Sequence, residues 1–237
     1  MPDRAQYYRW LQQDAAAFGG VIQTGDPERS VPACPGWTLR ELTIHLGGVH
    51  RWARDAIITG KPQELERPAP GAELPAWFAL GAESLLDVLR RSDPAAPAWT
   101  FGPHPRTVGF WDRRQAQETA IHLWDAHDSQ GTVHQLDPEL ALDGIAEIVE
   151  VMFPRQVRRE RIAPLGVGLR VRTTESPGRE FVIAGTGVDG DRSYGATISG
   201  PAADVLLTLW GRVPVDHLDI EGDRAVADQV LAAGITG

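Results

Sequence analysis

Two residues near the middle of the chain, Glu118 and His122, have the types and the spacing of a metal-ligand pair. Four residues apart on a helix, their side chains would share one face, with Cβ atoms about 5–6 Å apart. One carboxylate and one imidazole at that distance can bind a single cation. A third ligand from another helix would complete a facial site of two histidines and one carboxylate. Such a site leaves coordination positions open for a substrate.

His45 is the natural third ligand. It falls in the middle of an expected helix, on a largely apolar face, where burial of an unpaired imidazole would be costly. His50, five residues later, would leave that face and is expected at the edge of the bundle. A structural alternative stays open, because a Glu-x-x-x-His pair is often only a solvated ion pair and a histidine among leucines is often a satisfied core residue. Spacing alone therefore makes His45, Glu118 and His122 a hypothesis for a metal site.

Three further features could carry chemistry. Cys34, the single cysteine, precedes a helix, but its Pro-x-Pro-Gly-Trp setting is typical of a rigid structural entry. The glycines from Gly185 to Gly190 spell G-x-G-x-x-G, and a dinucleotide site would need a helix directly after them. A strand is expected there, so we interpret them as a hairpin loop. Arg212 follows an expected helix, where it could favour the helix dipole or hold a substrate carboxylate.

The elements that must position these residues are predicted from the spacing of apolar side chains. Up to about residue 161 the spacing is helical, with helices expected from near Tyr7, after the capping box Thr38–Glu41, and from Pro75, Thr107 and Asp137. Long irregular joins favour a helical bundle. Beyond Pro164 the pattern indicates a small α+β unit, with strands over 167–174, 179–184, 193–199 and 215–220 and helices over 201–210 and 223–233. We therefore predict two domains, residues 1–162 and 163–237.

Composition narrows the class of protein. The 237 residues are 42% hydrophobic and 23% charged, which predicts a folded globular chain. A net charge of −9 argues against nucleic acid as a partner, which requires a basic face. No apolar run reaches the ~18 residues of a membrane span, and no signal-peptide pattern opens the chain. We expect a soluble, cytoplasmic protein that takes small molecules and binds neither nucleic acid nor membranes. Its oligomeric state stays open.

Three ordered segments resemble one family over nearly the whole chain. Residues 31–38 (VPACPGWT) with 45–53 (HLGGVHRWA) form the first, and Glu118 to His122 with the following Trp-Asp-Ala form the second. The third runs from residues 200–212 to the Glu-Gly-Asp at 221–223. Together they are similar to the mycothiol-dependent maleylpyruvate isomerase-like proteins.

The resemblance implies a DinB-like four-helix bundle followed by a small sterol-carrier-like α+β domain. It implies a divalent metal, with zinc expected, bound by His45, Glu118 and His122. Arg212 matches the family's arginine that faces the site, while Leu123 stands where an arginine is common. A single lysine and no asparagine indicate a GC-rich genome, which fits an actinobacterial source that uses mycothiol as its small thiol.

The implied activity is that of a metal- and mycothiol-dependent isomerase or S-transferase. A metal-bound thiolate would attack an electrophilic small molecule of the maleylpyruvate type. In an isomerase, addition to a cis double bond, rotation and expulsion of the thiolate would give the trans product. In a transferase the thiol would stay on the electrophile. Arg212 would orient a substrate carboxylate. Two alternatives remain: a metal-dependent hydrolase with Asp125 as a weak candidate base, and a non-catalytic small-molecule-binding protein of the same fold.

Overall fold

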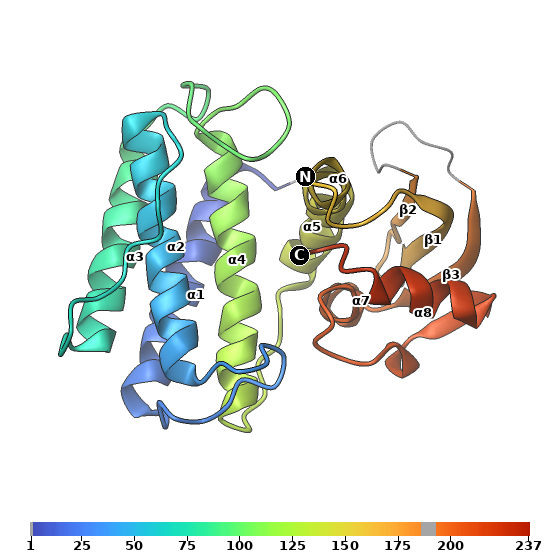
Figure 1. The fold of residues 1–237 in the computed structure, drawn as a ribbon, viewed down its shortest axis with the longest axis horizontal. Coiled ribbons are helices and arrows are strands. Elements are labelled where there is room, and N and C mark those ends of the chain that lie inside the picture. The colour runs from blue at the N-terminus through green and yellow to red at the C-terminus, as the bar shows by residue number, and fades with distance from the viewer. Residues whose placement is uncertain (1, 186–192) are drawn as a thin grey trace. The chain divides into compact units, whose positions relative to one another are not determined.

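The computed structural model describes residues 2–185 and 193–237, which form two compact units, residues 1–135 and 136–237. The first unit is an all-helical bundle and the second combines helices with a sheet (Figure 1). The predicted fold class, a four-helix bundle followed by an α+β domain, is confirmed.

Four long helices make the first unit: α1 (Arg4–Thr24), α2 (Leu39–Thr59), α3 (Leu74–Arg91) and α4 (Gly109–Ser129). The Asp3 carboxylate caps α1 by accepting the Gln6 N–H at 2.8 Å. At the start of α2, the Glu41 carboxylate accepts the Thr38 N–H at 2.8 Å, which confirms the predicted capping box. The sequence thus fixes where the helix that carries His45 begins.

Helix α4 is the buried helix of the bundle. It packs against α1 and α2, and α3 packs against α1 and α2 on the other side. Large apolar side chains fill the space between them, among them Phe18, Leu42, Leu46, Phe78 and Leu123. Each such side chain contributes about 1.5–3 kcal/mol when it leaves water. Polar residues of α4 that face this interior must therefore find partners there, which is the setting of the candidate site.

A four-stranded mixed sheet organises the second unit. Its strands are β1 (Leu165–Thr173), β2 (Glu180–Gly185), β3 (Tyr194–Gly200) and β4 (Asp219–Gly222), in the order β2-β1-β3-β4. The β1–β2 and β3–β4 pairs are antiparallel and the central β1–β3 pair is parallel. The helices are α5 (Pro138–Glu147), α6 (Phe153–Arg158), α7 (Ala202–Leu209) and α8 (Arg224–Ala232), with a π-helical stretch (Ile148–Met152) between α5 and α6.

Two details of the predicted strands need correction. The turn at Ser176–Gly178 joins β1 and β2, the first two predicted strands, in an antiparallel hairpin. However, β2 and β3 lie on opposite sides of β1, so the glycine-rich segment after β2 does not connect a hairpin. Residues 186–192 of that segment lie outside the described residues. The strand expected from Val215 opens instead with a 3-10 turn, and the paired strand is β4.

The division between the units also differs from the predicted boundary at residues 162 and 163. The structure divides after Gln135, because α5 packs against α7 and so belongs with the sheet unit. Helical spacing could assign α5 and α6 only to the helical half. The packing of α5 against α7, which is distant in sequence, is what assigns α5 to the second unit.

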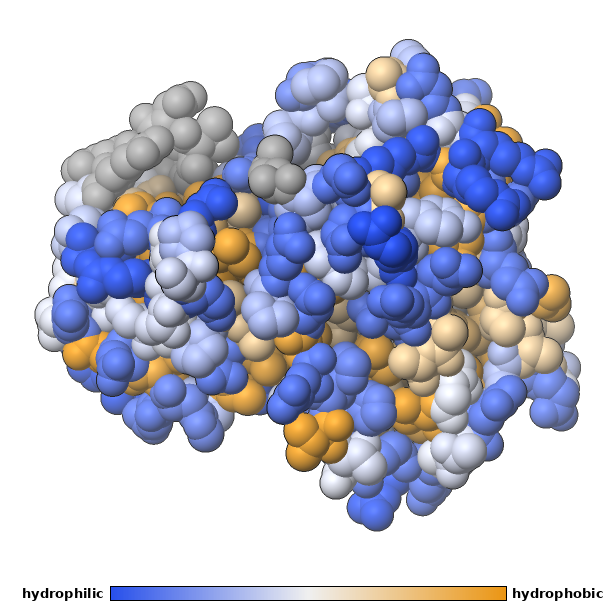
Figure 2. All heavy atoms as spheres, turned by 180° about the vertical axis from the view of Figure 1, so that it is seen from behind, coloured by the Kyte–Doolittle hydropathy of each residue, from blue (hydrophilic) through white to orange (hydrophobic). Residues whose placement is uncertain are grey.

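Within the residues that the structure describes, no helix combines the length and the apolar character that a bilayer crossing requires. On the face drawn in Figure 2, hydrophobic side chains are interspersed among hydrophilic ones.

Candidate metal centre

The three predicted ligands meet between α2 and α4. Glu118 and His122 lie one helical turn apart on α4, and the Oε1 atom of Glu118 is 3.3 Å from Nε2 of His122. The same Oε1 atom is 3.2 Å from Nε2 of His45 on α2. The two imidazole rings meet edge to face, with centroids 5.1 Å apart. One ligand atom from each of the three residues thus lies within 4.8 Å of the other two.

Buried charges at this cluster compensate one another. Burial alone would raise the pKa of Glu118, but hydrogen bonds from His122 and His45 hold it well below the ordinary value. Burial alone would lower the pKa of His122, but its bonds to Asp125 and Glu118 outweigh burial and raise that pKa to about 9. A carboxylate with so low a pKa is fully ionised at neutral pH. It therefore attracts the protonated imidazole of His122 or, in place of that proton, a metal cation.

Two further residues of α4 hold the ligands from behind. The Arg114 guanidinium donates to Oε2 of Glu118 at 3.0 Å, and Nδ1 of His122 donates to Oδ2 of Asp125 at 2.9 Å. From the sequence alone, Asp125 is only a weak candidate base, and Arg114 is not among the predicted site residues. Its spacing, four residues before Glu118, was the available signal, because such pairs form ion pairs on a helix.

Cys34 approaches the same cluster from the segment before α2. Its Sγ is 3.8 Å from Oδ2 of Asp125, and the side chain is half-buried. Cys34, His122 and Asp125 form a second group whose ligand atoms lie within 4.8 Å of one another. Two overlapping groups of possible metal ligands are therefore present among the described residues, and His122 belongs to both.

A small cavity lies against the outer side of His45. Its volume is about 180 Å³. Besides His45, its walls are Trp37, Glu41, Ile44, Leu65, Glu66 and Arg67. The Trp37 ring packs on the His45 ring with centroids 4.8 Å apart. The cavity joins an apolar wall to charged groups of both signs, next to His45, whose side chain is 26% exposed. A small polar molecule can thus reach the cluster from this side.

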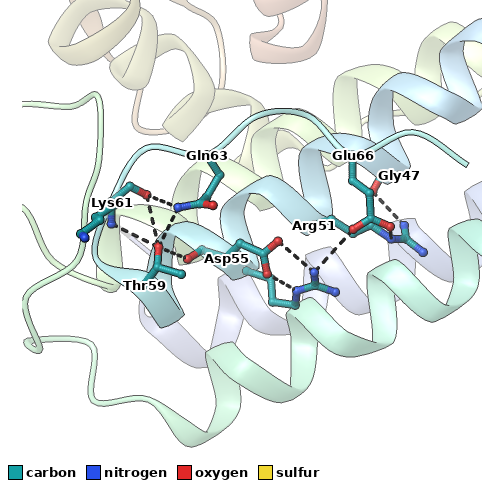
Figure 3. Close-up of polar contacts among 8 residues, drawn as sticks. Gly47, Arg51, Asp55, Thr59, Lys61, Gln63 and Glu66 are labelled. Carbon is teal, nitrogen blue, oxygen red and sulfur yellow. Dashed lines mark hydrogen bonds and ion pairs between the residues drawn. The ribbon is translucent and has the colours of Figure 1, made fainter.

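The loop after α2 forms one wall of that cavity, and polar contacts hold the loop against α2 (Figure 3). Glu66 pairs with Arg51 at 3.2 Å, and the Gln63 side chain donates to the Thr59 hydroxyl at 2.9 Å. The backbone of the loop comes so close to α2 that a Cβ on Gly48 would lie 2.8 Å from the Glu66 carbonyl oxygen. Gly48, three residues after His45, is therefore required for the close approach of this wall.

His50 differs from its predicted place at the edge of the bundle. It is fully buried, its Nε2 lies 2.9 Å from the Thr119 hydroxyl, and its ring packs near Phe78. Burial lowers the pKa of His50 to about 3, so it is neutral. Because α2 is covered by both α3 and α4, the helix face five residues beyond His45 is also an interior face.

Arg212 lies in the second unit, just beyond the C-terminal end of α7 at Leu209. Its backbone turns out of the helix at Gly211, whose φ of 69° is in the left-handed region. The guanidinium donates to the Trp210 carbonyl at 2.8 Å and lies 5.6 Å from the Trp210 ring centroid. This half-buried position is compatible with either interpretation made from the sequence.

Comparison with known proteins decides the family. The model of the mycothiol maleylpyruvate isomerase N-terminal domain matches residues 9–127, and that of the corresponding C-terminal domain matches residues 139–229. The chain belongs to this family. The first match spans all three predicted ligands, together with Arg114 and Asp125.

Solved structures agree with this assignment at the level of the fold. A crystal structure of the mycothiol-dependent maleylpyruvate isomerase superposes with a TM-score of 0.67 at 15% identity, over 94% of this chain and 95% of that one. A histidine-to-alanine mutant of the mycothiol-dependent maleylpyruvate isomerase gives 0.69 at 13% identity, with the same coverage of both chains. No curated protein sequence matches the chain. Identities this low establish the fold and leave the substrate open.

Proposed function

We propose that this protein is a divalent-metal- and mycothiol-dependent isomerase or S-transferase that acts on an electrophilic small molecule of the maleylpyruvate type. One observation carries the proposal: a single ionised oxygen, Oε1 of Glu118, faces the Nε2 atoms of His45 and His122 at 3.2 and 3.3 Å. Family membership supports it.

The donor set fits a divalent transition metal, with zinc as the expected ion. Two imidazole nitrogens and one carboxylate oxygen are the ligands such ions accept, and Nδ1 of His122 is already engaged by Asp125, which leaves Nε2 as the donor. When bound, the ion would lower the pKa of a thiol and hold it as the nucleophilic thiolate. His45, Glu118 and His122 would hold the ion, and their roles as ligands are part of this proposal.

The residues around the cluster would orient the reactants. Trp37 and Ile44 present apolar surface in the cavity beside His45, and Arg67 presents a cation for a carboxylate of the thiol or of the electrophile. The covered side of the cluster, behind Glu118 and His122, is occupied by Arg114 and Asp125. Reactants would therefore approach from the His45 side.

The hydrolase alternative has less support. It needs a general base near the open side, and Asp125 was the candidate. The Asp125 side chain is fully buried and its Oδ2 accepts the His122 Nδ1–H, so it is aimed at the ligand and away from solvent. The binding-protein alternative leaves the convergence of three ligands without a role.

Metal analysis and a thiol-dependence screen test the proposed function. We expect about one divalent ion per purified chain. Turnover of cis-unsaturated dicarboxylates, or conjugation of other electrophiles, should require both the ion and mycothiol. Turnover of hydrolysable esters or amides with the ion but without thiol would favour the hydrolase. A chain that binds no ion would contradict both enzymatic proposals.

Arg212 is proposed as the residue that orients a substrate carboxylate. Arg212→Ala should then lower kcat/KM, and the loss of transition-state stabilisation calculated from that fall should be about 2–4 kcal/mol. The metal content should be unchanged. Arg212→Lys should recover little, because an ammonium cannot reproduce the bidentate fork of the guanidinium. If Arg212 only favours the helix dipole, stability should fall by up to about 1 kcal/mol with near-normal turnover. Steady-state kinetics and thermal melting of both variants separate these outcomes.

A further inference from the structure

Four charged or ionisable residues form a ladder along one face of α4. Arg114, Glu118, His122 and Asp125 follow one another at spacings of four, four and three residues. Each contacts the next: Arg114 Nη2 to Glu118 Oε2 at 3.0 Å, Glu118 Oε1 to His122 Nε2 at 3.3 Å, and His122 Nδ1 to Asp125 Oδ2 at 2.9 Å. The two proposed ligands are the inner members, and one ionic residue stands at each end.

Each end residue hydrogen-bonds to one of the two side-chain atoms through which its neighbour could bind a metal ion. Arg114 engages Oε2 of Glu118 and leaves Oε1 for the cluster, while Asp125 engages Nδ1 of His122 and leaves Nε2. Both end residues are buried, with exposed side-chain fractions of 3% for Arg114 and 0% for Asp125. Water competes little for such contacts, so they define ligand orientation more strongly than surface pairs would.

We propose that Arg114 and Asp125 are positioning residues, which fix the single atom that each α4 ligand presents to the ion: Oε1 of Glu118 and Nε2 of His122. Asp125 fixes the tautomer of His122 by accepting its Nδ1–H, and it makes the imidazole a stronger donor. Arg114 keeps Glu118 to one coordinating oxygen, because the other is held in a charge-assisted hydrogen bond. This inference rests on the metal site of the proposed function.

The second ligand group, Cys34 with His122 and Asp125, is the competing interpretation. An ion there would have to bind Nδ1 of His122, which would break the 2.9 Å hydrogen bond to Asp125. It would also leave Glu118 without a bound metal ion. Glu118 is an ionised and largely buried carboxylate, and its oxygen lies beside the ring nitrogens of His45 and His122. The ladder therefore favours a role for Asp125 behind the ligands over a role as a ligand.

Metal affinity of Asp125→Asn tests one end of the ladder. Competition titrations of the apo protein against a chelator, with Zn²⁺ and with Co²⁺, should show affinity weakened by about 10–100-fold, the usual range for loss of an outer partner. Asp112→Asn is the matched control, because Asp112 is also a buried carboxylate of α4, paired with Arg4 at 3.0 Å outside the cluster. Its affinity should equal that of the parent. Equal affinities for the parent and Asp125→Asn would overturn the proposal.

The absorption spectrum of the Co²⁺ form tests the other end. With Arg114→Met, Glu118 can offer both oxygens, so the coordination number should rise and the visible absorption should weaken. Arg114→Lys should restore the parent spectrum in part, because an ammonium can still engage Oε2. A spectrum unchanged by Arg114→Met would show that Arg114 supports only the fold, and would overturn its positioning role.

Two spectroscopic measurements locate the ion without variants of Arg114 or Asp125. Long-range ¹⁵N–¹H spectra of the Zn²⁺ form should place the proton of His122 on Nδ1 and the ion on Nε2. A thiolate-to-cobalt charge-transfer band that disappears in Cys34→Ser would instead place the ion in the second group and overturn the inference. A parent protein that binds no ion at all would contradict the proposed function itself. Equal metal affinities of the parent and Asp125→Asn would contradict only the positioning role of Asp125.

Discussion

Two polar regions lie side by side between α2 and α4, and each contains one histidine of α2. In the outer region, His45 meets Glu118 and His122, with Trp37 and a cavity beside it. In the inner region, His50 meets the Thr119 hydroxyl and is fully buried. The pairs His45–Glu118 and His50–Thr119 join the same two helices within about one and a half turns of α2.

The two regions differ in the number of groups that converge and in how their charge is treated. The outer region holds the ionised carboxylate of Glu118, and hydrogen bonds to Asp125 and Glu118 raise the pKa of His122 to about 9. The inner region has one neutral hydrogen bond, and burial lowers the pKa of His50 to about 3. Its Nδ1 has no hydrogen-bond partner among the described residues. Convergent, compensated charge therefore distinguishes a candidate site from a core histidine on the same helix.

Replacing one histidine from each region gives the largest expected contrast. His122→Ala should weaken Zn²⁺ binding by more than about 100-fold, beyond the range for loss of an outer partner. His50→Ala should leave the affinity unchanged and lower the free energy of unfolding by about 1–3 kcal/mol, because it removes a buried hydrogen bond and opens a cavity. Chelator competition and urea unfolding of both variants measure the two effects. Tight Zn²⁺ binding by His122→Ala would remove the distinction between the regions.

Acidification should report on the inner region with a definite sign. His50 has a pKa of about 3 in the folded chain and an ordinary value near 6.5 when unfolded. Between these values only the unfolded chain takes up the proton, so stability is present above pH 6.5 and is lost as the pH falls. From pH 7.5 to pH 5 the loss attributable to His50 should be about 2 kcal/mol. His50→Gln should lack this component, as measured by urea unfolding at both pH values.

Asp112 provides a control of opposite sign. Burial raises its pKa to about 6 despite the Arg4 ion pair, so its contribution to stability is present at low pH and lost as the pH rises through 6. Asp112→Asn should therefore change the pH dependence in the opposite direction to His50→Gln. Parallel changes in both variants would indicate a general effect of acid on the bundle.

The contrast also marks what the sequence could and could not predict. The capping box at Thr38 and Glu41 and the spacing of Glu118 and His122 are local, and local spacing determines which residues share a helix face. That is why the sequence could pair Glu118 with His122. His45 joins the hypothesis as an imidazole on the apolar face of another helix, and its Nε2 lies 3.2 Å from Oε1 of Glu118. Their role as ligands stays a prediction.

Features that depend on partners distant in sequence were not accessible in this way. The sequence predicts His50 at the edge of the bundle, because spacing shows that it leaves the face of His45 and does not show which helix covers the next face. The contact of Cys34 with Asp125 joins residues 91 positions apart. The division between the compact units after Gln135 has the same cause, since α5 belongs with α7 only through tertiary packing. Arg114 is the exception, because its i,i+4 spacing to Glu118 was available in the sequence.

The smallest expected effect concerns the wall of the outer region. A Cβ at position 48 would meet the Glu66 carbonyl at 2.8 Å, so Gly48→Ala must push the loop away from α2. Overpacking costs about 1–3 kcal/mol, and the higher helix propensity of alanine offsets about 1 kcal/mol of it. The net loss of stability should therefore be about 0–2 kcal/mol. Because the loop carries part of the cavity beside His45, KM should rise while metal content stays constant.

Gly19→Ala in α1 is the matched control for this prediction. A Cβ there would meet nothing within 4 Å, so the variant should gain up to about 1 kcal/mol from helix propensity alone. The difference between the two variants isolates the cost of displacing the loop. If Gly48→Ala were as stabilising as Gly19→Ala and left KM unchanged, the loop would yield freely and would not form a defined wall. The outer region would then differ from the inner one by its ligands alone.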